Sequence, residues 1–68
     1  MRYQSMQDDN GKFYVNQYWN DESGMTRRET LYSDMLEHEA DKLCATLNRY
    51  RTFLHDLPKG VTLENILD

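Results

Sequence analysis

A run of apolar residues at alternating spacings of four and three constrains this chain more than any other feature. The run has the a/d pattern of a coiled-coil seam, and its members are Leu36, Ala40, Leu43, Leu47, Tyr50, Leu54 and Leu57. A helix from about Asp34 to Leu57 is expected to be about 35 Å long, whereas strands of six or seven residues reach only about 20 to 23 Å. The rest of a small chain cannot cover such a stripe, so the pattern favours a partner.

The same seam predicts a homodimer in which two long helices pair antiparallel. This pairing places Ala40 opposite Tyr50 of the second copy, so that a small side chain meets a large one. It also brings the glutamates at the start of the seam beside the arginines at its end. The alternative is that the stripe packs on the chain's own sheet and C-terminal helix. The predicted dimer-interface residues are Leu36, Ala40, Leu43, Leu47, Tyr50 and Leu54.

The N-terminal half predicts three antiparallel strands. The Asn-Gly pair at positions 10 and 11 suits a two-residue type I′ turn, and the register of such a turn places Met6 opposite Val15. Residues 25–32 follow a polar loop and have the composition of a third strand. In this register three tyrosines share one face of the hairpin, namely Tyr3, Tyr14 and Tyr18.

The C-terminal half predicts a long and a short helix. Asp34 and Glu37 have the spacing of a capping box, and Pro58 is expected to end the helix that begins there. Thr62 is suited to cap a second, short helix that folds back onto the first. We therefore predict a single α+β domain over residues 1–68, with a three-stranded antiparallel sheet packed on one long helix, plus a short C-terminal helix.

Composition restricts the classes of function. Lys and Arg number 8 against 12 Asp and Glu, and the net charge of -4 disfavours long-range attraction to nucleic acid or anionic lipid. Cys44 is the only cysteine, which indicates a buried apolar residue in a reducing compartment. The sequence contains no long apolar run, and its N-terminus lacks the apolar core of a signal peptide. We expect a cytoplasmic protein without a membrane span.

Motifs for catalysis and metal binding are incomplete in this sequence. His38-Glu39 begins like the helical zinc motif His-Glu-x-x-His, but Lys42 stands where the second histidine is required. His38 lies six residues before Cys44 and His55 lies eleven after it, so neither is a direct helical neighbour of the thiol. We therefore expect a non-enzymatic protein with no catalytic, cofactor-binding or metal-binding residues.

The tyrosines of the predicted hairpin are candidates for recognition. Exposed tyrosines rimmed by arginine are typical of protein-binding surfaces. Tyrosines on a sheet can also stack the bases of single-stranded nucleic acid, although the acidic balance of the chain disfavours this. In a third interpretation, cross-strand aromatic pairs only shield the sheet. The predicted partner-binding residues are Tyr3, Tyr14, Tyr18 and Arg28.

The order of the predicted elements and one helical motif together suggest a family. The motif is Glu39-Ala40-x-x-Leu43-Cys44-x-x-Leu47-Asn48. Over roughly residues 3 to 48 the chain resembles the small uncharacterised proteins encoded by bacteriophages and prophages. The resemblance implies an accessory protein that binds and regulates or inhibits a host protein, and it transfers no catalytic residues. Single-stranded nucleic-acid binding through the tyrosine face is the alternative function.

Overall fold

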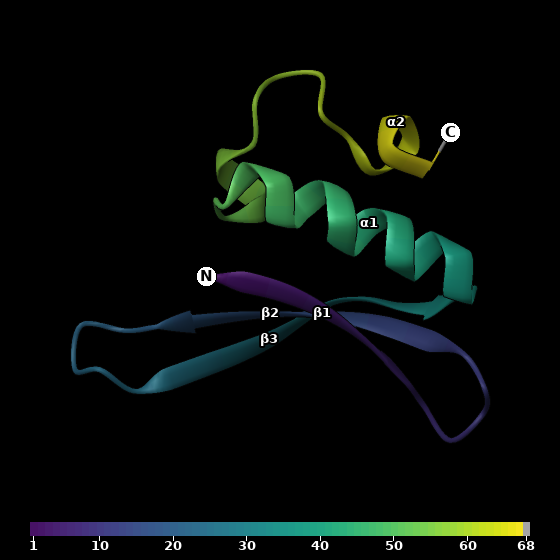
Figure 1. The fold of residues 1–68 in the computed structure, drawn as a ribbon, viewed down its shortest axis with the longest axis horizontal. Helices are drawn as coiled ribbons and strands as arrows, with labels where there is room; N and C mark the ends of the chain where they lie inside the picture. The colour runs from purple at the N-terminus through teal and green to yellow at the C-terminus, as the bar shows by residue number, and fades with distance from the viewer. Residues whose placement is uncertain (68) are drawn as a thin grey trace.

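Two helices lie on one face of a three-stranded sheet in the computed structural model, which describes residues 1–67 (Figure 1). The strands follow one another as antiparallel neighbours in the order β1 (Arg2–Gln7), β2 (Phe13–Asn20) and β3 (Thr26–Met35). They are followed by α1 (Glu37–Tyr50), the 3-10 turn η1 (Leu54–Asp56) and α2 (Leu63–Leu67). The predicted α+β architecture is confirmed. The last residue of the predicted 1–68 domain, Asp68, lies outside the described residues.

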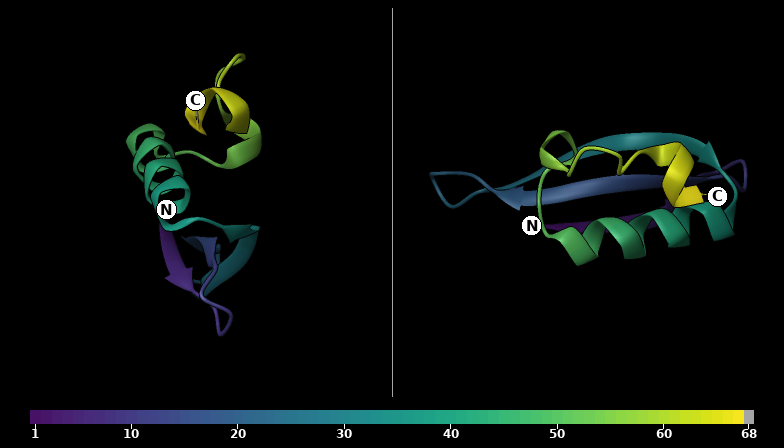
Figure 2. Two further views of the ribbon diagram at one scale, coloured as in Figure 1. Left: turned by 90° about the vertical axis from the view of Figure 1, so that its right-hand side faces the viewer. Right: turned by 90° about the horizontal axis from the view of Figure 1, so that it is seen from above.

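The helical layer covers only one side of the sheet. α1 runs over β1 and β2, and the chain after it returns alongside α1 to end in α2 (Figure 2). The end of the β2–β3 hairpin extends past the helical layer, and no helix or loop within residues 1–67 lies against the other face of the sheet (Figure 1, Figure 2). The molecule is accordingly thin, with principal extents of 34 × 32 × 14 Å.

The turn between β1 and β2 is longer than the predicted two residues. The Asp8 N–H donates to the Lys12 carbonyl at 2.8 Å, so the loop contains three residues, 9–11. The Asp8 carboxylate accepts hydrogen bonds from the backbone N–H groups of Asn10 and Lys12, both at 2.9 Å. Gly11 closes the loop at φ 80, in the left-handed region that glycine adopts without strain. The Asp8 side chain thus stabilises the longer loop.

This extra loop residue shifts the hairpin register by one. Met6 pairs with Tyr14 instead of Val15, and Tyr3 pairs with Gln17 instead of Tyr18. A shift of one residue turns side chains of one strand to the opposite face relative to its partner. Tyr3 therefore faces the helices, and Met6 joins Tyr14 on the uncovered side.

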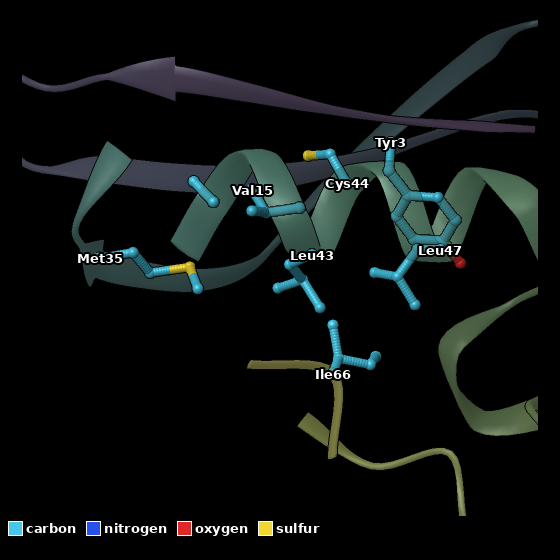
Figure 3. Close-up of a cluster of buried hydrophobic side chains, with 8 residues drawn as sticks. Tyr3, Val15, Met35, Leu43, Cys44, Leu47 and Ile66 are labelled. Carbon is cyan, nitrogen blue, oxygen red and sulfur yellow. The ribbon is translucent and has the colours of Figure 1, made fainter. Parts of the chain in front are cut away.

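The core lies between the sheet and the helices. Val15, Leu43 and Leu47 are completely buried, and Ile66 of α2 points toward the two leucines of α1 (Figure 3). Tyr3 and Cys44 complete the core from β1 and α1, and the expected burial of Cys44 is confirmed.

The start of α1 differs from the prediction. The Leu36 N–H donates to the Glu39 carboxylate at 3.0 Å. Leu36 is therefore the N-cap residue, and Glu39 is the glutamate that accepts its backbone N–H. Asp34, the predicted cap, still lies in β3 and has a positive φ of 57. The predicted capping box was therefore placed two residues too early. The start of α2 is as expected, because the Thr62 hydroxyl accepts the Asn65 N–H at 3.3 Å.

The prediction that α1 continues to Leu57 is wrong. The helix ends at Tyr50, and Arg51 takes the left-handed conformation at φ 53. The Tyr3 hydroxyl donates to the Thr52 carbonyl just beyond this point. Phe53 then packs edge-on against Trp19, with ring centroids 5.8 Å apart. These contacts hold the chain in its return path over the sheet.

The shorter helix changes the interpretation of the heptad seam. Ala40, Leu43 and Leu47 have no exposed surface, because they pack against the chain's own sheet and α2. Leu54 lies on η1, not on α1, and packs against the same core. The central side chains of the predicted antiparallel interface thus lie in the chain's own core in this structure, whereas its members Leu36 and Tyr50 are exposed. Homodimerisation stays a prediction.

Candidate functional site

The uncovered side of the sheet forms the candidate site, which we call the open face. Cross-strand pairing arranges its side chains in three rows. The rows are Arg2–Tyr18–Arg28, Gln4–Asn16–Thr30 and Met6–Tyr14.

The middle row contains a buried amide, Asn16, that is hydrogen-bonded to an exposed threonine, Thr30. The side chain of Asn16 is only 1% exposed although it lies on the uncovered side of the sheet. Its Oδ1 accepts a hydrogen bond from the Thr30 hydroxyl at 2.7 Å, and its Nδ2 donates to the Tyr18 hydroxyl at 3.3 Å. A buried amide with partners for both ends fixes the side chains around it. Asn16 thus holds the side chains of Tyr18 and Thr30 in place on the open face.

Two tyrosines converge above this row. The hydroxyls of Tyr14 and Tyr18 lie 3.9 and 4.0 Å from the Met6 sulfur, although the tyrosines are four residues apart on β2. Met6 itself is 41% exposed. Methionine is unbranched and polarisable and adapts to different partner shapes. The rings and the thioether together form a continuous surface at this end of the sheet.

The first row is positively charged. The Arg2 guanidinium lies over the Tyr18 ring, 5.2 Å from its centroid, in a cation–π contact. Arg28 lies opposite Tyr18 on β3. Within residues 1–67 neither arginine forms an ion pair, whereas the adjacent Arg27 binds the Asp21 carboxylate at 2.7 Å. None of the residues in the three rows carries a carboxylate.

Two shallow hollows lie near the end of the β2–β3 hairpin. One, of about 310 Å³, opens beside the first row and is lined by Met1, Arg2, Tyr18, Trp19, Asn20 and Thr26. The other, of about 350 Å³, lies on the covered side beneath η1 and is lined by Gln17, Trp19, Glu29, Leu31, Phe53, Leu54 and His55. Only the first is continuous with the open face.

The open face brings together three of the four predicted partner-binding residues. Tyr14, Tyr18 and Arg28 share it. The predicted position of Tyr3 on the same face is corrected, because Tyr3 lies in the core with 4% of its surface exposed. Burial raises the pKa of the Tyr3 phenol. Five members of the open face were not among the predicted partner-binding residues, and the three of them on β1 would have been placed by the correct length of the Asp8 turn. These five members are Arg2, Gln4, Met6, Asn16 and Thr30.

The reactive side chains of the chain lie elsewhere. Burial raises the pKa of the Cys44 thiol, the Asp41 carboxylate raises it further, and a hydrogen bond with Ser5 opposes both. A thiol with a raised pKa is a weak nucleophile at neutral pH. His38 is exposed. Over residues 1–67, no three His, Cys, Asp or Glu side chains gather closely enough to hold a metal ion.

Comparison with known proteins identifies no relative for this fold or this site. No family model, curated protein or solved structure matches the chain. In the part of the chain that the structure describes, no helix is both long and apolar enough to span a membrane.

Proposed function

We propose that this chain is a non-enzymatic binding protein that docks on a protein partner through its open face. The observation that carries the proposal is the buried Asn16 amide, which is hydrogen-bonded to Thr30 and Tyr18 within an exposed surface of tyrosine, methionine and arginine. Tyrosine and arginine are enriched among the residues that dominate interface energies. Because of the resemblance to phage proteins, a host protein that is regulated or inhibited by binding is the expected class of target.

Single-stranded nucleic acid is the second candidate ligand. The Tyr14 and Tyr18 rings with Arg2 and Arg28 supply the residue types that stack bases and contact phosphates. A protein partner is favoured because the Arg2 guanidinium already occupies one side of the Tyr18 ring. The net charge of -4 also opposes the approach of a polyanion.

An affinity pull-down from bacterial lysate with a matched pair of variants tests the proposal. Met6 and Leu36 are both apolar and similarly exposed, at 41% and 50%, but only Met6 lies on the open face. We expect Met6→Asp to lose the captured protein and Leu36→Asp to retain it, as read by quantitative mass spectrometry. Equal capture by the two variants would contradict docking through the open face. Circular dichroism spectra identical to wild type establish that both variants are folded.

Fluorescence anisotropy with 15-nucleotide oligo-dT and oligo-rU at low ionic strength tests the second candidate. Nucleic-acid binding predicts a dissociation constant that increases steeply with salt concentration. It also predicts weaker binding by Met6→Asp. An unchanged anisotropy for both oligonucleotides would eliminate this candidate.

A further inference from the structure

The two ends of the open face differ in chemistry. The Arg2–Tyr18–Arg28 row is cationic, whereas the Met6–Tyr14 row is apolar and aromatic. On the basis of the proposed function, we infer that the partner presents a carboxylate and an apolar side chain about 13 Å apart, the length of four residues of extended chain. The carboxylate would bind at the arginine row, and the apolar side chain would pack against Met6 and Tyr14.

The arginine row has the geometry of a carboxylate clamp. Arg2 and Arg28 flank Tyr18 on neighbouring strands, so their Cα atoms are about 10 Å apart at a strand spacing of about 4.8 Å. Neither guanidinium is neutralised by an ion pair within residues 1–67. Arginine binds carboxylates through two parallel hydrogen bonds, which favours this ligand at an exposed site. The hollow of about 310 Å³ beside Arg2 and Tyr18 offers space for the carboxylate.

The opposite end supplies the apolar contact. Met6 is 41% exposed and lies against the hydroxyl ends of Tyr14 and Tyr18. Between the two ends, the Asn16 amide already has hydrogen-bond partners and is buried. The Asn16 amide therefore does not need a polar group from the ligand.

Charges beyond the two ends oppose a ligand that is negative along its whole length. Asp8 and Asp9 lie in the β1–β2 turn, beyond the Met6 row. Glu22 and Asp21, the latter paired with Arg27, lie in the β2–β3 turn, beyond the arginine row. A nucleic-acid strand that follows β2 would meet carboxylates at both turns, whereas a segment with one acidic end meets arginines only. The charge pattern therefore favours an acidic protein segment over a polynucleotide.

Selection from a displayed library of random 12-residue peptides tests this inference. We expect the enriched peptides to carry Asp or Glu together with an apolar residue, predominantly four positions apart. Synthetic versions of the enriched peptides are then titrated against wild-type protein and variants by fluorescence anisotropy. Arg2→Gln/Arg28→Gln should weaken binding at least tenfold. The matched control, Arg49→Gln/Arg51→Gln, removes the same charge near the end of α1 and should leave the affinity unchanged.

Each outcome separates the inference from the proposed function. If Met6→Asp abolishes peptide binding but Arg2→Gln/Arg28→Gln does not weaken it, the carboxylate inference is wrong and the open face still binds protein. If Met6→Asp has no effect, the proposed function is wrong as well. Failure to enrich acidic peptides would overturn the inference. The wild-type protein could also bind 15-nucleotide oligo-rU more tightly than any selected peptide and lose this binding in Arg2→Gln/Arg28→Gln. That result would show that the ligand is nucleic acid and would overturn the inference.

Discussion

The two faces of the sheet show how a short chain separates stability from recognition. The covered face packs β1, β2, α1 and α2 into one apolar core, in which Val15, Leu43 and Leu47 are completely buried. The open face buries only the polar side chain of Asn16 and leaves Met6 and Arg28 exposed. Substitutions on the open face should therefore affect binding more than stability, whereas substitutions on the covered face should mainly affect stability. The following substitutions test this contrast.

The largest effect is expected for Leu47→Ala on the covered face. Loss of a fully buried leucine should lower the free energy of unfolding by about 2 to 5 kcal/mol through lost burial and the remaining cavity. Urea unfolding followed by circular dichroism measures this change. Met6→Ala on the open face is the control and should cost less than about 1 kcal/mol. Equal losses for the two variants would contradict the division of roles.

A smaller effect is expected for Asn48→Ala, at the junction of α1 and β1. The Asn48 side chain accepts the Tyr3 N–H at 2.7 Å and donates to the Tyr3 carbonyl at 3.0 Å. Removing both hydrogen bonds should lower the free energy of unfolding by about 1 to 2 kcal/mol. Hydrogen exchange of the Tyr3 amide should accelerate at the same time. Asn48→Asp keeps an acceptor for the Tyr3 N–H. The Tyr3 amide should therefore exchange more slowly in Asn48→Asp than in Asn48→Ala.

Thr30→Val tests the hydrogen bond between Thr30 and Asn16 on the open face. The substitution keeps the shape of the side chain but removes the hydroxyl that donates to Asn16 Oδ1 at 2.7 Å. We expect a loss of about 1 kcal/mol in the free energy of unfolding, because a buried acceptor loses its partner. The Asn16 side-chain amide resonances in an NMR spectrum should broaden. Unchanged resonances would show that Asn16 does not depend on Thr30.

The smallest effect concerns the β2–β3 turn, which belongs to neither face. Hydrogen bonds from the Ser23 hydroxyl and from Arg27 lower the pKa of the Asp21 carboxyl from 3.8 to about 2. Between these values the unfolded chain binds more protons than the folded one, so stability decreases as the pH falls from about 3.8 to about 2. Urea midpoints measured across this range should show the slope in wild type. Asp21→Asn should reduce the slope, and an identical slope in both would exclude Asp21 as its cause.

The element types and their order were predictable from local sequence patterns. The Asn-Gly pair at positions 10 and 11, the polar loop before residue 25 and the Thr62 cap each act within a few residues, and the structure contains the elements that they predict. The helical spacing from Ala40 to Leu47 likewise reports a buried face. Such signals depend on nearest neighbours and can be read without knowledge of the tertiary fold.

The register of β1 and the end of α1 depend on contacts that local patterns do not contain. The Asp8 carboxylate stabilises a three-residue loop in place of the two-residue turn that Asn10-Gly11 favours. The resulting one-residue change in the hairpin register places Tyr3 in the core. The helix ends where Tyr3, far away in the sequence, bonds the Thr52 carbonyl. The apolar spacing continues to Leu57 because the returning segment packs on the same core as the helix does. Tyr14, Tyr18 and Arg28 share one face because β2 and β3 pair antiparallel, as predicted.

The side chain of Asn48 also limits how copies of this protein can associate. By bonding both outward-facing backbone groups of Tyr3, it fills the position that another strand would take at the β1 edge. β3 is the only other edge of the sheet. If strands can be added only at the β3 edge, two copies can pair edge to edge, but the combined sheet cannot grow further into a fibre. The Asn48 amide thus disfavours the addition of a further strand beside Tyr3.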